Sequence, residues 1–123
     1  MVRSGIKFDR GVTESHRGPV LTFVETATFT RLITGLLSDE DYAKFQQELA
    51  ASPDRGDLLV GCGGVRKVRM AVAGRGKSGG ARVLYLYLRH RDVIYLLYLF
   101  TKGDAANLSA GGRKAMRELA HEI

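Results

Sequence analysis

The stretch that most constrains the fold is 61–102, which holds three strand-like segments separated by a glycine-rich loop and a short turn. Residues 81–88 and 93–100 are rich in valine, leucine, tyrosine and phenylalanine, as buried strands are. The turn over 89–92 is short enough for a hairpin. Residues 65–73 alternate in polarity, as a third strand does. These segments predict adjacent antiparallel strands at the centre of a sheet.

The same part of the chain concentrates the positive charge. No Asp or Glu occurs over 58–91, whereas eight Lys and Arg residues do, and the formal net charge of the whole chain is +6. The remaining residues are slightly acidic, with eleven Lys and Arg against thirteen Asp and Glu. Because like charges repel one another, such a concentration indicates a site for a polyanion. Nucleic acid is the first candidate.

A chain of 123 residues fits a single domain, which we expect over 20–123. Residues 1–19 contain little apolar material and predict a flexible N-terminal extension. No apolar run approaches the roughly 20 residues of a membrane span, and residues 1–12 lack the apolar core of an export signal. Cys62 is the only cysteine, which fits a reducing compartment. We therefore expect a soluble cytoplasmic protein.

Helix signals occur in three places. Thr26 or Thr28 can cap a helix that ends near residue 37, and Ser38 with the acidic residues after it caps a second that ends near residue 51. Ser109 can cap a third helix over 110–122. The remaining predicted elements are a strand over 20–25 and a short strand over 57–60.

The loop over 74–80 contains two patterns typical of nucleotide-binding sites. Its glycines spell GxGxxG, but that motif opens a helix, and a strand is predicted from residue 81. The same objection excludes a P-loop. Arg75 and Lys77 of this loop can approach a phosphate, although a solvated hairpin loop is an equally good interpretation.

Metal ligands and catalytic histidines are not grouped in the sequence. His16, His90 and His121 are scattered, and none has metal-ligand spacing with another histidine or with Cys62. The acidic residues avoid the basic strands, which argues against a nuclease with carboxylate-bound metal. We predict neither a metal nor a cofactor.

Four cations are expected to converge at one end of the sheet. Lys67 and Arg69 lie two residues apart in a predicted strand, so their side chains share a face. Arg82 begins the next strand, and Lys102 follows the one after that. A solvated basic face is the alternative interpretation, but an uncompensated group of cations favours an anionic ligand.

Several motifs resemble those of the HigB/RelE toxins of bacterial type II toxin–antitoxin modules, particularly the HigB-like branch. The matching segments are FVET at 23–26, LSDEDYAKFQQEL at 37–49, GCGGVRKVRMAVAGRGKSGGARVLYLYL at 61–88, YLLYLFTKGD at 95–104 and LSAGGRKAM at 108–116. The resemblance runs from about residue 21 to the C-terminus. Residues 1–19 lie outside it, because these toxins usually begin at the first strand.

The resemblance implies a RelE/ParE-like α+β fold, in which two N-terminal helices pack on a mainly antiparallel, twisted sheet and a helix ends the chain. It implies an endonuclease that cuts mRNA in the ribosomal A site without a metal, through attack of the 2′-hydroxyl on the adjacent phosphate. The implied partners are a helix-turn-helix antitoxin of the HigA type, the ribosome and mRNA.

Site residues carry over from the family by position. Lys67 is then the candidate base, and Arg69 and Arg82 stabilise the phosphorane. Lys102 is the candidate acid or phosphate ligand. Tyr98 can stack on a base, with a core tyrosine as the alternative interpretation. The full set of candidates for RNA contact is Arg66, Arg75, Lys77 and Tyr98.

Two other functions remain open at this stage. One is a toxin of the same fold that inhibits a protein such as DNA gyrase, as ParE-like relatives do; these relatives lack the convergent cations. The other is a non-catalytic RNA-binding module. Such modules usually expose aromatic side chains for base stacking, whereas the tyrosines here lie mostly within apolar strands.

Overall fold

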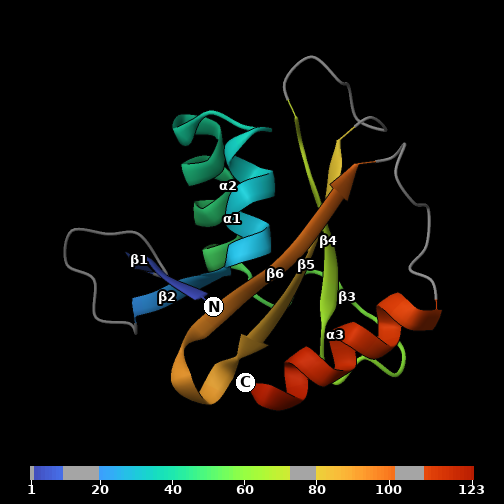
Figure 1. The fold of residues 1–123 in the computed structure, drawn as a ribbon. Coiled ribbons are helices and arrows are strands. Elements are labelled where there is room, and N and C mark those ends of the chain that lie inside the picture. Colours follow the sequence, from blue (N-terminus) through green and yellow to red (C-terminus); the bar gives the residue numbers. More distant parts are fainter. Residues whose placement is uncertain (1, 10–19, 73–79, 102–109) are drawn as a thin grey trace.

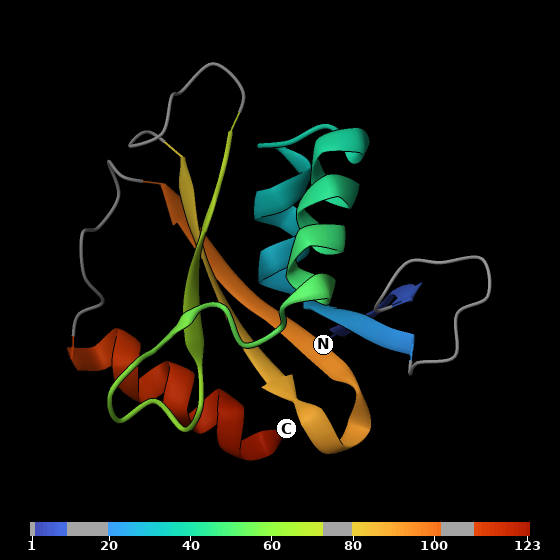
Figure 2. The same ribbon diagram turned by 180° about the vertical axis from the view of Figure 1, so that it is seen from behind.

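The computed structural model describes residues 2–9, 20–72, 80–101 and 110–123. Its elements are β1 (Val2–Asp9), β2 (Val20–Thr26), α1 (Ala27–Thr34), α2 (Asp39–Ala51), β3 (Asp57–Leu58), β4 (Arg66–Met70), β5 (Ala81–Leu88), the 3-10 helix η1 (Arg89–Arg91), β6 (Val93–Thr101) and α3 (Ala110–Glu122). The six strands form one sheet, with α1 and α2 on one face and α3 on the other (Figures 1 and 2). The predicted α+β fold class is confirmed.

The sheet has the strand order β1-β2-β6-β5-β4-β3. Only β2 and β6 pair in parallel, and every other neighbouring pair is antiparallel. The predicted adjacency of β4, β5 and β6 is therefore confirmed. β5 has the predicted bounds, whereas β4 is shorter than the predicted 65–73, because its ladder with β5 stops at the pair Met70↔Ala81.

The N-terminus departs from the prediction. We expected a flexible extension over 1–19, but Val2–Asp9 forms β1, which pairs antiparallel with β2. Strand pairing uses backbone N–H and C=O groups, and it does not require the apolar side chains whose scarcity suggested a flexible segment. β1 thereby covers an edge of β2. Residues 10–19 lie outside the described part of the chain.

Side-chain caps set the starts of α1 and α2. The hydroxyl of Thr26 accepts from Phe29 N–H at 3.0 Å and donates to the carbonyl of Leu97 at 2.8 Å, so it also fastens α1 to β6. Ser38 Oγ accepts from Asp41 N–H at 3.1 Å, as predicted for the second helix. Of the two predicted caps for α1, Thr26 is the one used. This helix ends before the predicted residue 37, at the C-cap Gly35.

Each face of the sheet has its own apolar layer. Phe29 and Ile33 of α1 and Phe45 and Leu49 of α2 pack on the inward side chains of β2, β4, β5 and β6. On the opposite face, α3 contributes the apolar side predicted for it. Its Met116 and Leu119, together with Ile123 just after the helix, pack against a buried group that comprises Cys62, Val65, Leu84, Leu86, Leu97 and Phe100.

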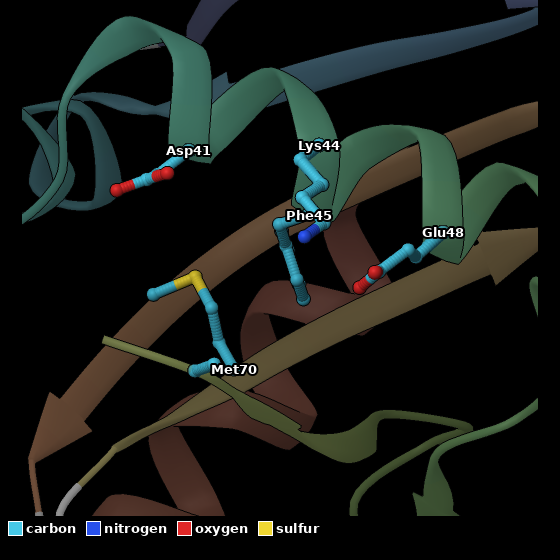
Figure 3. A pocket seen from close by; sticks show the side chains of 6 residues that line it. Asp41, Lys44, Phe45, Glu48 and Met70 are labelled. Carbon is cyan, nitrogen blue, oxygen red and sulfur yellow. The ribbon is translucent and has the colours of Figure 1, made fainter. Parts of the chain in front are cut away.

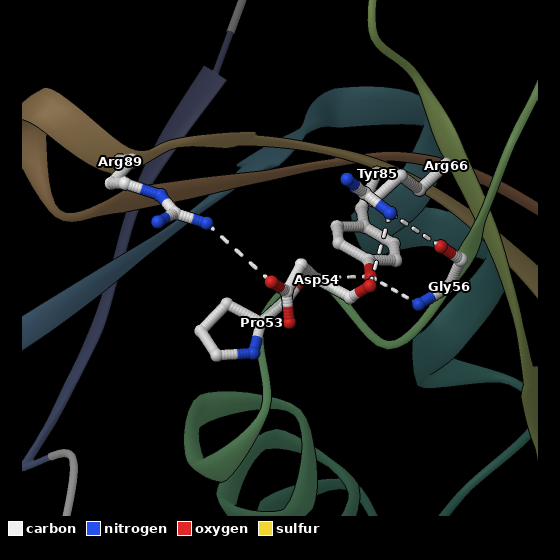
Figure 4. Close-up of polar contacts among 6 residues, drawn as sticks. All are labelled: Pro53, Asp54, Gly56, Arg66, Tyr85 and Arg89. Atoms are coloured by element: carbon white, nitrogen blue, oxygen red, sulfur yellow. Dashed lines mark hydrogen bonds and ion pairs between the residues drawn. The ribbon is translucent and has the colours of Figure 1, made fainter.

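Tyr85 of β5 fastens the segment between α2 and β3 to the sheet. Its buried hydroxyl donates to the carbonyl of Pro53 at 2.8 Å and accepts from Gly56 N–H at 2.9 Å (Figure 4). Arg66 Nη1 donates to the carbonyls of Asp54 and Gly56 at 3.0 and 2.7 Å. These bonds determine where the chain enters β3 and thus which residues lie opposite β4.

Replacement of Tyr85 by phenylalanine is expected to lower the free energy of unfolding by about 1–3 kcal/mol, because two buried backbone groups lose their partner. Burial raises the pKa of the Tyr85 hydroxyl above its ordinary value of 10.0. The folded protein therefore keeps a proton that the unfolded chain releases as the pH rises past about 10, and the wild type loses stability there. This loss should be smaller in Tyr85→Phe.

Denaturant unfolding of both proteins from about pH 8 to about pH 11 measures the effect, since the difference between the two stabilities removes the contribution of every other titrating group. A constant difference across this range would contradict the assignment of the loss to Tyr85.

Candidate active site

Three of the predicted site cations lie on one face of the sheet. Arg69 of β4 is directly opposite Arg82 of β5, and Lys67 is opposite Leu84. Directly opposite residues share a face, as do residues two apart on a strand. Lys67, Arg69 and Arg82, hereafter the cationic cluster, therefore project from the face on which α3 packs, because Leu84 belongs to the apolar layer under α3.

The hydrogen-bond alternation of β4 brings two of these cations close together. Leu59, directly after β3, donates its N–H to the carbonyl of Val65, directly before β4, at 2.9 Å. Leu59 and Val65 are therefore a hydrogen-bonded pair that continues the ladder between β3 and β4. By alternation, the backbone of Arg69 points away from β5, so Arg69 and Arg82 form a non-hydrogen-bonded pair. Such pairs have the shorter Cα separation, about 4.5 Å, and therefore the closer side chains.

The cationic cluster has little internal compensation. Arg69 is exposed, and Lys67 and Arg82 are half-buried. Within the described part of the chain, the side chains of Lys67 and Arg69 have no hydrogen bond or ion pair, and Arg82 Nη1 makes one long bond of 3.5 Å to the carbonyl of Ala81. Like charges directly opposite one another destabilise a sheet. An anion bound over the three cations would relieve that repulsion.

One acidic residue lies beside the cluster, and sequence reasoning missed it. Asp57 of β3 is directly opposite Lys67, so its exposed side chain projects from the same face. The expectation that acidic residues avoid the basic strands is wrong at this position. Asp57 precedes the acid-free stretch by one residue, and only the register of β3 on β4 places it next to Lys67.

Aromatic side chains border the cluster on β6. Tyr98 is opposite Leu84 and Phe100 is opposite Arg82, so both rings share the face of the cluster. Their centroids are 6.3 Å apart and their planes are inclined by 34°. Phe100 is buried, whereas Tyr98 is half-buried and packs at the margin of the layer under α3. Tyr98 can thus support the core and still offer part of its ring to a base.

The remaining predicted residues are not brought into this group. Arg66 projects from the α1 and α2 face with Val68 and Met70, as its alternation predicts, and its guanidinium binds the carbonyls of Asp54 and Gly56. Its observed role is to hold the chain before β3. The other three predicted site residues, Arg75, Lys77 and Lys102, lie outside the described residues.

Over 2–9, 20–72, 80–101 and 110–123, no group of three His, Cys, Asp or Glu side chains is placed to hold a metal ion. None of the helices in these ranges is long and apolar enough to cross a membrane.

Comparison with known protein families agrees with the fold. Residues 23–123 match the family described as the RelE toxin of the RelE / RelB toxin–antitoxin system. The chain belongs to the RelE toxin family. This RelE-family protein is therefore the toxin of a toxin–antitoxin module, and its partner is an antitoxin. The match begins inside β2, so β1 precedes the part of the chain that the family covers.

Proposed function

We propose that this toxin is a metal-independent endoribonuclease that cleaves mRNA on the ribosome and so inhibits translation. The observation that supports this most strongly is the cationic cluster. Three cations share one face of the sheet next to a half-buried tyrosine, and two of them are directly opposite each other. A phosphorane carries more negative charge than the phosphodiester from which it forms, so preorganised cations favour it over the ground state.

The proposed chemistry needs one base, one acid and a stabilised phosphorane. Lys67, the candidate base, accepts the proton of the 2′-hydroxyl, and the 2′-oxygen forms a bond to phosphorus. Arg69 and Arg82 stabilise the charge on the non-bridging oxygens. The bond to the 5′-oxygen then breaks, and that oxygen takes a proton from Lys102, the candidate acid. The products are a 2′,3′-cyclic phosphate and a 5′-hydroxyl.

We add Asp57 to the set of residues that act in the proposed reaction. Its carboxylate lies across from Lys67 on the neighbouring strand, within the range where cross-strand pairs of opposite charge interact. An RNA phosphate over the cluster repels the same carboxylate, so Asp57 and the message compete for Lys67.

In this proposal the ribosome positions the mRNA for cleavage. Arg69 is exposed and the cluster lies on strands, so the site attracts any RNA backbone through charge, which carries no sequence information. In-line attack needs one particular nucleotide geometry, and effective positioning accounts for a large share of catalysis. A ribosome that holds the codon in place supplies that geometry.

The ParE-like and non-catalytic alternatives explain less of the site. Inhibition of a protein such as gyrase does not require cations placed opposite each other, and a passive RNA-binding module does not require Lys67 and Asp57 to lie side by side. The motifs also favour the HigB-like branch within the family. On that basis we propose a helix-turn-helix antitoxin of the HigA type and action in the cytoplasm.

The decisive experiment replaces the attacking group of the message. In a purified translation system, an mRNA with a single 2′-deoxynucleotide on the 5′ side of the scissile phosphate should resist cleavage at that site. Cleavage of the all-ribose message should leave a 2′,3′-cyclic phosphate. A chelator of transition metals, added with magnesium kept in excess for the ribosomes, should not change the rate.

Two results would contradict the proposal. Cleavage of the deoxy-substituted message at the wild-type rate would exclude attack by the 2′-hydroxyl. Equal cleavage of the same mRNA with and without ribosomes would exclude the positioning role of the ribosome. A deoxy substitution one nucleotide further upstream serves as the matched control and should leave cleavage unchanged.

A further inference from the structure

Asp57 places an acceptor of hydrogen bonds beside three cations. It is the only acidic residue in the strands β3 to β6 as the structure describes them. Its side chain is exposed, and its carboxylate has no hydrogen bond or ion pair among the described residues. An ionised carboxylate can only accept hydrogen bonds. It therefore cannot bind the phosphate that the cations attract, but it can bind donor groups on another part of the RNA.

The backbone next to Asp57 is fixed by contacts that leave its carboxylate free. Gly56 donates its N–H to the Tyr85 hydroxyl at 2.9 Å, and its carbonyl accepts from Arg66 at 2.7 Å (Figure 4). A Cβ on Gly56 would lie 2.9 Å from the carbonyl oxygen of Lys67, so glycine is needed for this close approach of the two strands. The position of Asp57 beside Lys67 is thus set before any RNA binds.

Two rows of side chains cross the face that carries the cationic cluster. The first row, from β3 to β6, contains Asp57, Lys67, Leu84 and Tyr98. The second row, from β4 to β6, contains Arg69, Arg82 and Phe100. Neighbouring strands lie about 5 Å apart, so Asp57 and Tyr98 are separated by about 15 Å with the cations between them. A phosphate bound over the cations has a carboxylate on one side and an aromatic ring on the other.

The proposed reaction assigns one nucleotide to each of these two sides. Lys67 accepts the proton of the 2′-hydroxyl, which belongs to the nucleotide 5′ of the scissile phosphate. The ribose of that nucleotide therefore lies at Lys67, and its base is the one nearest to Asp57 on the adjoining strand. The base on the 3′ side lies towards Tyr98, where stacking on the ring tolerates any base.

We propose that Asp57 recognises the base on the 5′ side of the cut and selects guanosine there. In single-stranded RNA the Watson–Crick edge of a base is open to side chains. Guanine has two neighbouring donors on that edge, N1–H and the N2 amino group, which the two oxygens of one carboxylate can accept together. Adenine and cytosine place an acceptor beside their amino group, and uracil has a carbonyl on each side of its N3–H. The inference rests on the proposed function, because the role of Lys67 determines which nucleotide meets Asp57.

Carboxylates on the other face of the sheet are placed less well for this task. A cleft of about 240 Å³ between α2 and the end of β4 has the exposed residues Asp41 and Glu48 in its lining (Figure 3). Met70 also lines it and is buried in the apolar layer under α1 and α2. The cleft therefore lies across the sheet from the cationic cluster, out of reach of a base whose phosphate is bound there.

Base analogues in the message test the assignment. In a purified translation system, we compare mRNAs that differ only in the nucleotide 5′ of one mapped cleavage site. Guanosine should be cleaved at least about 10-fold faster than uridine, which is the scale of hydrogen bonds to a charged group. Inosine lacks the N2 amino group and should be cleaved at an intermediate rate. The matched control is 7-deazaguanosine, which keeps the Watson–Crick edge and should be cleaved like guanosine.

Asp57→Asn separates recognition of the base from a structural role. The amide offers one donor and one acceptor, which do not match the two donors of guanine. The rates for guanosine and uridine should then differ by less than about 2-fold. A change that only loosened β3 would slow every message by the same factor. Glu48→Gln removes an exposed carboxylate of the cleft and should keep the wild-type preference.

The possible failures can be told apart. Cleavage of all four messages at rates within about 2-fold, with 2′,3′-cyclic phosphate ends, would overturn the inference and leave the proposed function standing. An unchanged preference for guanosine in Asp57→Asn would assign the selectivity to the ribosome or to another side chain, and so would also overturn it.

A binding measurement covers the case in which the wild type cleaves no message and the proposed function fails. The toxin is titrated with two dinucleotides that cannot be cleaved, 2′-deoxyguanylyl-uridine and 2′-deoxyuridylyl-uridine, and the amide signal of Asp57 is followed by NMR. Tighter binding of the guanine compound, lost in Asp57→Asn, would show that the recognition stands without the reaction. Equal affinity for the two compounds would overturn the recognition as well.

Discussion

Arg82→Ala is expected to slow ribosome-dependent cleavage of mRNA by about 10²- to 10³-fold, the usual cost of removing one electrostatic contact to a developing oxyanion. Arg82 is half-buried and makes one long hydrogen bond, to the carbonyl of its neighbour Ala81. Its side chain therefore contributes little to the fold. Single-turnover cleavage in a purified translation system measures the rate, and circular dichroism confirms that the variant is folded.

Two further variants sharpen this prediction. Arg82→Lys should restore only part of the rate, because lysine keeps the charge but lacks the bidentate geometry of the guanidinium. Arg89→Ala is the matched control. Arg89 is 77% exposed and its ion pair with Asp54 spans 3.4 Å on the surface, so its loss should change the rate by less than about 2-fold. Wild-type activity in folded Arg82→Ala would exclude the proposed role.

Leu84→Ala is expected to lower the free energy of unfolding by about 2–5 kcal/mol, which is the largest effect on stability that we predict. Leu84 is fully buried and belongs to the layer under α3. It also lies between Lys67 and Tyr98 in one row across three strands. The substitution thus opens a cavity between two of the residues that are proposed to bind RNA.

Leu58→Ala provides the control for this variant. Leu58 is also a strand leucine, but it is 59% exposed, so its truncation should change the free energy of unfolding by less than about 0.5 kcal/mol. Urea unfolding of both variants gives the comparison. A loss below about 1 kcal/mol for Leu84→Ala would mean that α3 closes over the cavity.

Local sequence signals predicted the central strands and the helices of this toxin. Continuous apolar runs gave β5 and β6, and alternation placed Lys67 and Arg69 on a face opposite to Val68 and Met70. Ser38 and the acidic residues after it marked the start of α2. These features depend on residues within a few positions of one another, which is why periodicity and capping chemistry suffice for them.

Long-range register could not be read from the sequence in the same way. The proximity of Asp57 to Lys67 depends on where β3 enters the sheet, which Tyr85 and Arg66 determine through bonds to loop carbonyls and an amide. The parallel pairing of β2 with β6 and the strand character of Val2–Asp9 are further examples. The contacts of Arg66 with the carbonyls of Asp54 and Gly56 also depend on the path of the chain before β3.

The parallel pairing of β2 with β6 bears on how the nascent toxin acquires its structure. Thr22 pairs with Val93, and Thr26 donates to the carbonyl of Leu97 at a sequence separation of 71 residues. On this side β2 therefore has no partner strand until β6 has left the ribosome. Contacts of such separation slow folding. β2 therefore gains its inner neighbour only after α1, α2, β4 and β5 have been synthesised.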